Sequence, residues 1–397
     1  MILLFVTRAS STDLSQLMSS FSINNVSLSV SYSGPFLRSP LMASTPKSGV
    51  FQISLFRSVF SRMAVPIIQG VSVSMTVSDS KFVHSSTPIR FDAVSQASKS
   101  AGNRKQYKSK SVKLIRNNFE FCHSLLDNGG ALFISNCNVT ISGCLFFQGS
   151  AVNGGAMYVI GSNIDIQSTN IVKCNSKKNA AGFLVKNCDI VMMNCIFCNN
   201  RAAQDVGALS VKSCSIHMKN LKFYGNHAAH RFGAIQMVGS EGQFTLCYFK
   251  DNTCPDYPFG TSFATSECPE YLLLEHCYFY DTESVPISVS TDCSIYVTNP
   301  IFMGNLDESI HIYDSEKGIK PKYTMVNPIG YGKGMPALPH LPAELLRDVI
   351  LWRETEPYFE WKGLYLIIAL MIIVFSMIGL IVPALILPSS KRGSRQL

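Results

Sequence analysis

A short sequence pattern that recurs at a nearly constant interval constrains this chain more than any other feature. In five places a turn of small residues leads into an apolar strand, as in Gly129-Gly-Ala-Leu-Phe-Ile and Gly154-Gly-Ala-Met-Tyr-Val. The glycines shared by the five copies are spaced by 25, 27, 25 and 26 residues: Gly130, Gly155, Gly182, Gly207 and Gly233. A fixed period of this length is typical of a solenoid, in which each repeat stacks on the next.

Each repeat contains two further short strands. The second strand alternates apolar and polar residues and starts at Asn138, Asn163, Asp189, Ser215 and Gln243. The third strand carries a large apolar residue in register, at Phe146, Ile171, Phe197, Phe223 and Phe249. Three positions after each of the last three residues there is an asparagine: Asn200, Asn226 and Asn252. Alternation directs every second side chain inward, so three strands and their turns account for one repeat.

These strands predict an all-β fold: a right-handed parallel β-helix with about 25–26 residues per coil. One coil cannot cover its own apolar face, so neighbouring coils stack and bury a continuous core. Residues one period apart should then lie above one another at a spacing of about 4.8 Å. We expect one ladder of Ile164, Ile190 and Ile216, and another of Phe197, Phe223 and Phe249. An α/β fold is excluded because residues 120–315 show no sustained helical periodicity.

The small and polar residues between the strands allow more than one interpretation. The shared glycines suit a corner that needs a positive φ or a close approach between coils. The asparagines after the third strand either adopt left-handed turns or form hydrogen bonds along the stack. The 13 cysteines fall into columns, and we interpret them as small apolar fillers, with disulfides between adjacent coils as the alternative. Cys195 and Cys198 form a C-x-x-C pair without a second pair, so no zinc site is predicted.

Weaker matches extend the repeat in both directions. We predict a β-helix over residues 20–315, with its clearest repeats at 119–253. A basic loop at 99–116 contains seven Lys/Arg and no acidic residue. We interpret this loop as a solvated bulge between coils, with a surface for an anionic ligand as the alternative. Residues 316–362 lose the pattern and contain six prolines, which predicts a stalk.

The segment at 363–388 carries no charged residue over 26 positions. A bilayer core needs about 20 apolar residues in a helix, so we predict one C-terminal transmembrane α-helix rather than a buried core helix. Aromatic side chains gather at its start, as they do at a membrane interface: Tyr358, Phe359, Trp361 and Tyr365. The short tail at 389–397 contains three basic residues and no acidic one, so the positive-inside rule places it in the cytoplasm.

Residues 1–19 form an N-terminal segment that is a weak candidate for a signal peptide. Its apolar run covers only residues 2–6, whereas a signal core has about 7–15 apolar residues. Three alternatives stay open: a poor signal, a start further upstream, or a tail-anchored chain whose main domain faces the cytosol. We predict the exported arrangement, a single-pass plasma-membrane protein with the β-helix outside the cell and the C-terminus in the cytoplasm.

The repeats resemble those of the polymorphic membrane proteins of chlamydiae and their protist relatives. That family has paired Gly-Gly-Ala-(Ile/Leu/Val) and Phe-x-x-Asn motifs, which resemble residues 129–132, 154–157, 207–209 and 233–235 and the three Phe-x-x-Asn sets. The matches cover about residues 119–253, a third of the chain. The resemblance implies a β-helical surface domain linked to adhesion. The bacterial members end in a different membrane anchor, so this chain, with its single apolar helix, looks like the protist type.

Three functions fit this architecture. The leading hypothesis is an adhesin or interaction module that binds a host or extracellular glycan or protein ligand, with residues 363–388 in the lipid bilayer. The second is a polysaccharide-active enzyme, because pectate lyases and polygalacturonases have the same architecture. The third is a structural membrane rod without a specific ligand. Fold alone does not separate them.

We predict that the chain is not an enzyme and has no catalytic, cofactor-binding or metal-binding residues. The acidic residues of the repeats fall at different phases of the coil: Asp165, Asp189, Asp205 and Asp251. His217 alternates with apolar residues and should point outward, while His227 and His230 should lie in a turn. A nucleic-acid partner is discounted because Tyr107 is the only aromatic residue in the basic loop.

Overall fold

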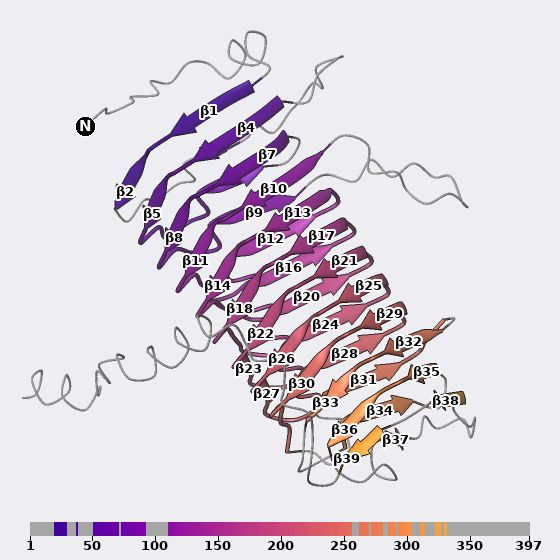
Figure 1. Cartoon of the computed structure of the whole chain (residues 1–397). Coiled ribbons are helices and arrows are strands. Elements are labelled where there is room, and N and C mark those ends of the chain that lie inside the picture. Colours follow the sequence, from indigo (N-terminus) through magenta and orange to yellow (C-terminus); the bar gives the residue numbers. More distant parts are fainter. Residues whose placement is uncertain are drawn as a thin grey trace, which may run out of the picture. The chain divides into compact units, whose positions relative to one another are not determined.

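The computed structural model describes residues 20–29, 37–38, 51–70, 73–92, 110–255, 262–269, 271–280, 285–290, 293–303, 310–313, 322–326 and 329–331. Over these residues the chain is an all-β, right-handed parallel solenoid without helices, which confirms the predicted fold class for this part of the chain (Figure 1). None of the residues that the structure describes belongs to a helix long and apolar enough to cross a membrane. The predicted transmembrane helix at 363–388, the tail at 389–397 and the segment at 1–19 lie outside the described residues.

Four parallel sheets, which we name A to D, run along the solenoid. Sheet A contains β1 (Ser20–Asn24), β4 (Phe51–Phe56), β7 (Val73–Ser78), β10 (Ser111–Ile115), β13 (Asn138–Ser142), β17 (Asn163–Gln167), β21 (Asp189–Met193), β25 (Ser215–Lys219), β29 (Glu241–Thr245), β32 (Leu272–Glu275), β35 (Ser294–Thr298) and β38 (Lys322–Val326). Sheet B contains β2 (Ser27–Ser29), β5 (Val59–Ser61), β8 (Lys81–Val83), β11 (Asn118–Glu120), β14 (Leu145–Phe147), β18 (Asn170–Val172), β22 (Ile196–Cys198), β26 (Lys222–Tyr224), β30 (Tyr248–Lys250), β33 (Tyr278–Phe279), β36 (Ile301–Met303) and β39 (Ile329–Tyr331).

The other two sheets complete the coil. Sheet C contains β3 (Leu37–Arg38), β6 (Ile68–Gly70), β9 (Ile89–Asp92), β12 (Leu132–Ser135), β16 (Met157–Ile160), β20 (Phe183–Lys186), β24 (Leu209–Lys212), β28 (Ile235–Val238), β31 (Phe263–Ser266), β34 (Ile287–Ser290) and β37 (Ile310–Tyr313). Sheet D is the smallest and contains β15 (Ser150–Ala151), β19 (Asn175–Ser176), β23 (Arg201–Ala202) and β27 (His227–Ala228).

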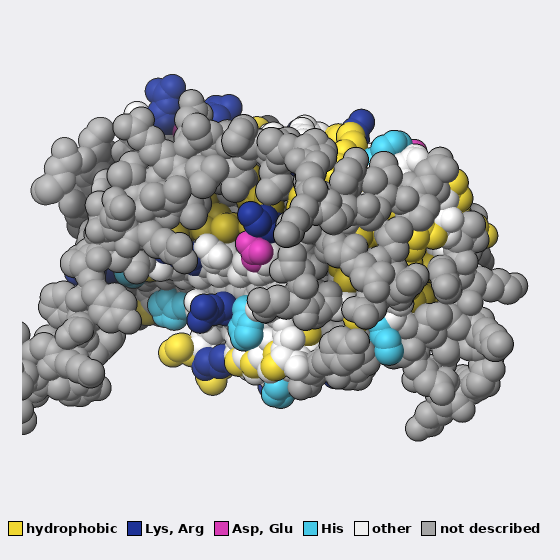
Figure 2. Space-filling view, turned by 60° about the horizontal axis from the view of Figure 1, so that its bottom comes forward, with side chains coloured by type: hydrophobic (Ala, Val, Ile, Leu, Met, Phe, Trp, Pro, Cys, Tyr) yellow, Lys and Arg dark blue, Asp and Glu magenta, His cyan; other side chains and the backbone are white. Residues whose placement is uncertain are grey.

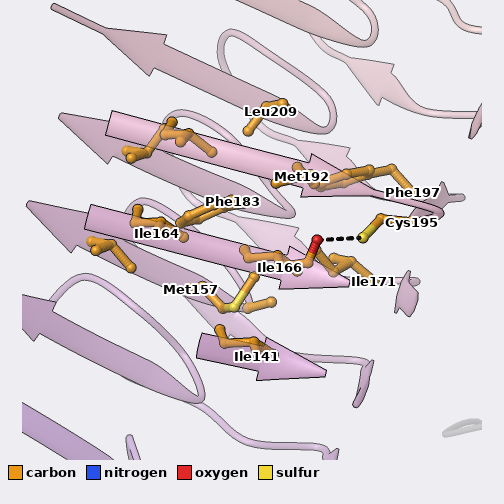
Figure 3. Close-up of a cluster of buried hydrophobic side chains, with 14 of the residues drawn as sticks. Ile141, Met157, Ile164, Ile166, Ile171, Phe183, Met192, Cys195, Phe197 and Leu209 are labelled. Carbon is orange, nitrogen blue, oxygen red and sulfur yellow. Dashed lines mark hydrogen bonds between the residues drawn. The ribbon is translucent and has the colours of Figure 1, made fainter. Parts of the chain in front are cut away.

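The predicted ladders are confirmed by the register of the sheets. Ile164 pairs with Ile190, which in turn pairs with Ile216. The rings of Phe197 and Phe223 are 4.9 Å apart, and those of Phe223 and Phe249 are 5.1 Å apart, stacked almost parallel in both cases. Side chains of sheets A, B and C point into one interior, where the Cys195 thiol also donates to the Ile166 carbonyl at 3.8 Å (Figure 3). The core is therefore continuous along the stack.

The register of the third repeat corrects the glycine alignment. The Gly155 amide donates to the Ala180 carbonyl, and the Ala181 amide makes the equivalent bond to Val206. Ala181, rather than Gly182, therefore stands in the glycine column, and its spacings are 25, 26, 26 and 26 residues. The column consists of Gly130, Gly155, Ala181, Gly207 and Gly233.

Close approach between coils, and not a positive φ, explains the glycines in this column. A Cβ atom on Gly130 would lie 2.1 Å from the carbonyl oxygen of Gly155, and one on Gly207 would lie 2.0 Å from that of Gly233. The left-handed conformation belongs to the preceding residue instead, for example Val206 with φ 67°. A backbone contact this tight leaves no room for most side chains.

The asparagines after the third strand form a buried ladder. The Asn200 side-chain amide donates to Oδ1 of Asn226 at 2.9 Å, and that of Asn226 donates to Oδ1 of Asn252 at 2.9 Å. The second N–H of Asn226 reaches the Phe197 carbonyl at 3.1 Å. All three side chains are buried. The stacking interpretation is therefore confirmed, and the left-handed residue is again the preceding one, as at Asn199 with φ 54°.

The cysteines are divided between one disulfide and a set of buried thiols. Cys268 and Cys293, in adjacent coils, are joined by a disulfide. Ten other cysteines are buried and unpaired within the described residues: Cys122, Cys137, Cys144, Cys174, Cys188, Cys195, Cys198, Cys214, Cys247 and Cys277. The filler interpretation therefore holds for most of them, and the disulfide interpretation for one pair.

Burial should make the thiols that have no exposed surface slow to react in the folded protein. Cys174 has no exposed surface, and this burial raises its pKa to about 12. Because the thiolate is the reactive form, we expect native Cys174 to resist iodoacetamide at pH 8 and to be alkylated once the chain is unfolded in urea. Peptide mass spectrometry would measure this, with the half-buried Cys254 as the internal comparison. Equal labelling of Cys174 in both states would contradict the buried position.

The extent of the strands departs from the sequence-based prediction in three places. Four coils contain a fourth short strand, the strands of sheet D, where three strands per coil were expected. Within the predicted basic loop, residues 111–115 form β10 and pair with sheet A, while residues 99–109 lie outside the described residues. Strands β38 and β39 stack on the solenoid inside the segment predicted as a stalk, which extends the coils to Tyr331.

Candidate ligand-binding face

A shallow groove of about 410 Å³ lies across β13, β17, β21 and β25 of sheet A. It is lined by the first three residues of each of these strands. The middle residue of each trio is buried, as Ile190 is in β21, whereas its neighbours Asp189 and Val191 are exposed. The alternation of the strand therefore displays two columns of side chains on the outer face.

The two columns differ in chemistry but are both predominantly polar. The column of first positions is Asn138, Asn163, Asp189 and Ser215. The column of third positions is Thr140, Asp165, Val191 and His217. Amides, hydroxyls, carboxylates and an imidazole thus repeat at the strand spacing of about 4.8 Å. Such a face can bind an extended, hydrogen-bonding ligand.

Hydrogen bonds between coils and along strands orient these side chains. The Asn163 amide donates to Oδ1 of Asn138 at 3.1 Å. The Gln167 amide donates to Oδ1 of Asp165 at 3.1 Å from two residues further along β17. Nδ1 of His217 lies 2.6 Å from the amide nitrogen of Gln243 in the next coil. These hydrogen bonds therefore hold several polar side chains of the groove in place before any ligand binds.

Asp165 and Asp189 lie at different phases of the coil, as predicted, but their phases differ by two residues, so both side chains are on this face. Asp165 pairs with Val191, and Asp189 precedes Val191 by two residues, so the two carboxylates are diagonal neighbours. Side chains related in this way lie roughly 7 Å apart. Asp205 lies elsewhere and pairs with Arg231 at 2.9 Å, and Asp251 lies at the corner after β30.

The histidines separate into two surfaces. His217 is exposed on the outer face of sheet A, in agreement with its predicted orientation. His227 belongs to β27 of sheet D, where a turn was expected, and its Nδ1 lies 2.9 Å from Oγ1 of Thr253. Partial burial, with Arg201 of the adjacent coil, lowers the pKa of His227. His230 lies in a turn after this strand, as predicted.

Exposed aromatic side chains continue the two columns beyond the groove. Tyr271 follows Glu241 in the column of first positions, because Leu272 pairs with Gly242. Tyr296 follows Leu273 in the column of third positions. Their exposed fractions are 51% for Tyr271 and 47% for Tyr296, unusually high for large aromatic side chains. These rings form flat apolar platforms with a hydroxyl at the edge.

The groove is mildly acidic on a chain that is basic overall. Its lining contains two carboxylates and neither lysine nor arginine, while the whole chain has a net charge of +8. The face drawn in Figure 2 instead displays lysine, arginine and histidine side chains among apolar ones, with little acidic surface in view. Among the described residues, no group of three or more His, Cys, Asp or Glu could hold a metal ion.

Comparisons of the chain with known families, proteins and structures found no match. The resemblance to the polymorphic membrane proteins therefore depends on the repeat motifs alone. What the structure adds is the β-solenoid itself and the groove on its outer face.

Proposed function

We propose that this chain is a single-pass membrane-anchored surface protein whose β-solenoid binds an extended glycan along the outer face of sheet A. The groove lined in register by Asn163, Asp165, Asp189 and His217 is the observation that carries the proposal. Residues 363–388 supply the anchor in this arrangement, on the strength of their uninterrupted apolar sequence.

The spacing and the chemistry of the face support a sugar polymer as the ligand. Coils repeat every ~4.8 Å, close to the length of one sugar unit in an extended polysaccharide, so successive sugars can meet the same two strand positions on successive coils. Amides can donate hydrogen bonds to sugar hydroxyls and accept them, and carboxylates can accept them. Tyr271 and Tyr296 lie in the same columns and can stack on the apolar face of a sugar ring.

The binding proposal predicts a large effect of removing the groove carboxylates. Asp165→Ala combined with Asp189→Ala should weaken binding by about tenfold or more, because each change removes charge-assisted hydrogen bonds. The full chain in detergent would be titrated with a panel of soluble neutral and acidic polysaccharides. Lys222→Ala, on the outer face of sheet B, is the matched control and should leave affinity unchanged. Binding of a protein and of none of the glycans would overturn the glycan proposal.

The anchor and the orientation need a separate experiment. Protease added to intact cells that express the chain should remove residues 1–320 and leave the C-terminal tail protected. Permeabilised cells provide the control, in which the tail is cut as well. Protection of residues 1–320 in intact cells would place the solenoid in the cytosol and defeat the surface role.

A glycan-cleaving activity is the second candidate, and the pair Asp165 and Asp189 favours it. Diagonal positions on neighbouring strands lie roughly 7–8 Å apart, a spacing from which two aspartate side chains can reach the carboxyl separation of about 6.5–9.5 Å found in inverting glycosidases. Any polysaccharide that binds would be incubated with the protein and assayed for new reducing ends. Asp165→Asn and Asp189→Asn should each abolish cleavage if this candidate is right, whereas bound but intact polysaccharide supports pure recognition.

A further inference from the structure

The corner between sheets C and A carries a column of small side chains that contain sulfur or oxygen. Its members follow one another at intervals of one coil: Cys137, Ser162, Cys188, Cys214, Ser240, Cys268 and Cys293. In five of the steps the backbone N–H of one residue donates to the Sγ or Oγ atom of the next, at 3.1–3.4 Å. Each such atom therefore reaches back over the preceding coil.

Two cysteines are adjacent at only two steps of this column. One step is Cys268 and Cys293, which form the disulfide. The other is Cys188 and Cys214, where the same backbone contact is present: the Cys188 amide donates to Sγ of Cys214 at 3.4 Å, against 3.1 Å for the bonded pair. Strands in register place the Cα atoms of adjacent coils about 4.8 Å apart. This spacing is inside the range of about 4.4–6.8 Å that a disulfide spans.

We propose that Cys188 and Cys214 are the site of a second disulfide between adjacent coils, formed when the chain meets an oxidising thiol–disulfide pool. Glutathione disulfide can supply the oxidation. The Cys214 thiolate attacks it and releases one glutathione thiolate, and the Cys188 thiolate then displaces the other. The two cysteine thiols lose two protons and two electrons, and glutathione disulfide becomes two glutathione molecules.

The electrostatics of the pair suit this order of events. The hydrogen bond from the Cys188 thiol lowers the pKa of Cys214, and the same bond raises the pKa of Cys188. Cys214 is therefore the better attacking group. Both residues keep 4% of their surface exposed at the corner. Cys247 and Cys277 are also one coil apart but have no exposed surface, so a soluble oxidant cannot reach them without unfolding.

The test uses the folded full chain in detergent, exchanged against glutathione disulfide and then alkylated in urea. Trypsin cleaves after Lys186, Arg201, Lys212 and Lys219, so Cys188 lies in peptide 187–201 and Cys214 in peptide 213–219. We expect these two peptides to be linked, with the linkage placed at Cys188 by fragmentation. Alkylated Cys214 should fall by about tenfold relative to the protein reduced with dithiothreitol, a change in ratio that corresponds to about 30 mV for this two-electron couple.

Serine variants separate the proposal from non-specific oxidation. Cys188→Ser should abolish the link between the two peptides and leave Cys214 as a mixed disulfide with glutathione, because no second thiol displaces the glutathione. The fold should tolerate this change because serine already occupies the column at Ser162 and Ser240. Cys137 faces Ser162 and should stay alkylatable throughout. Full alkylation of Cys214 after exchange, or a link through Cys195 or Cys198, would overturn the proposal. Formation of the bond in cells depends on the proposed export, whereas the exchange experiment does not, so failure of one leaves the other testable.

Discussion

Replacing Phe223 by alanine should lower the free energy of unfolding by about 3–5 kcal/mol, the usual cost of truncating a buried phenylalanine. The ring has no exposed surface and stacks on Phe197 at 4.9 Å and on Phe249 at 5.1 Å. Loss of the ring opens a cavity that is lined by both neighbouring coils. The backbone pairing of β26 with β22 and β30 keeps the coils at their spacing, so they cannot collapse to fill the cavity. Urea unfolding followed by circular dichroism would measure the shift of the midpoint.

The control for this variant comes from the same face of the coil but points outward. Leu145 precedes Phe146 in β14, and its side chain is only half-buried. Leu145→Ala should therefore cost well under half as much as Phe223→Ala. Equal shifts for the two variants would mean that Phe223 does not occupy a stacked interior position, which would contradict the solenoid register.

Replacing Asn226 by aspartate should be destabilising to a similar degree, by about 3–5 kcal/mol at neutral pH. The Asn226 amide donates to the Phe197 carbonyl at 3.1 Å and to Oδ1 of Asn252 at 2.9 Å. A carboxylate has no proton to give, so both acceptors lose their partner and a charge is buried beside an oxygen. Because burial raises the pKa of the new carboxyl above the ordinary aspartate value of about 3.9, the loss of stability should shrink as the pH falls from 7 towards 4.

An exposed asparagine of the same coil provides the matched comparison. The Asn220 amide donates to Oδ1 of Asn194 at 2.8 Å on the surface of the stack. Asn220→Asp should change the unfolding midpoint by much less than Asn226→Asp, because water can solvate the new charge. Thermal unfolding at pH 4 and pH 7 would compare the pair. A pH-independent loss for Asn226→Asp would show that the site is open to solvent.

The repeat pattern predicted the fold because each of its signals is local. Alternation in β21 and β25 separates buried Ile190 and Ile216 from exposed His217 within a few residues. The fixed period then determines which residues stack. The alignment of Gly182 with the other glycines was wrong because the third copy reads Ala-Gly-Phe, and the alignment matched glycine to glycine instead of keeping the period. The constant step of 26 residues on either side of Ala181 was the stronger signal.

The candidate site was harder to predict because it depends on register rather than on a motif. Asp165 and Asp189 are 24 residues apart, two fewer than one coil. Their side chains therefore lie on the same face of sheet A, on the adjacent strands β17 and β21. That arithmetic was available from the period: the two residues differ in phase, but a difference of two residues along a strand leaves both side chains on the same face. The short strands of sheet D gave no signal of their own, because two residues carry no periodicity.

The asparagine ladder has a direction. Every amide in it points the same way along the stack, from Asn200 through Asn226 to Asn252, and each carbonyl oxygen accepts from the coil before it. A coil removed or added as a whole leaves each donor facing an acceptor, whereas a shorter insertion in a strand breaks every column at once. The reach of such a molecule can therefore change only in steps, by about 4.8 Å for each complete coil.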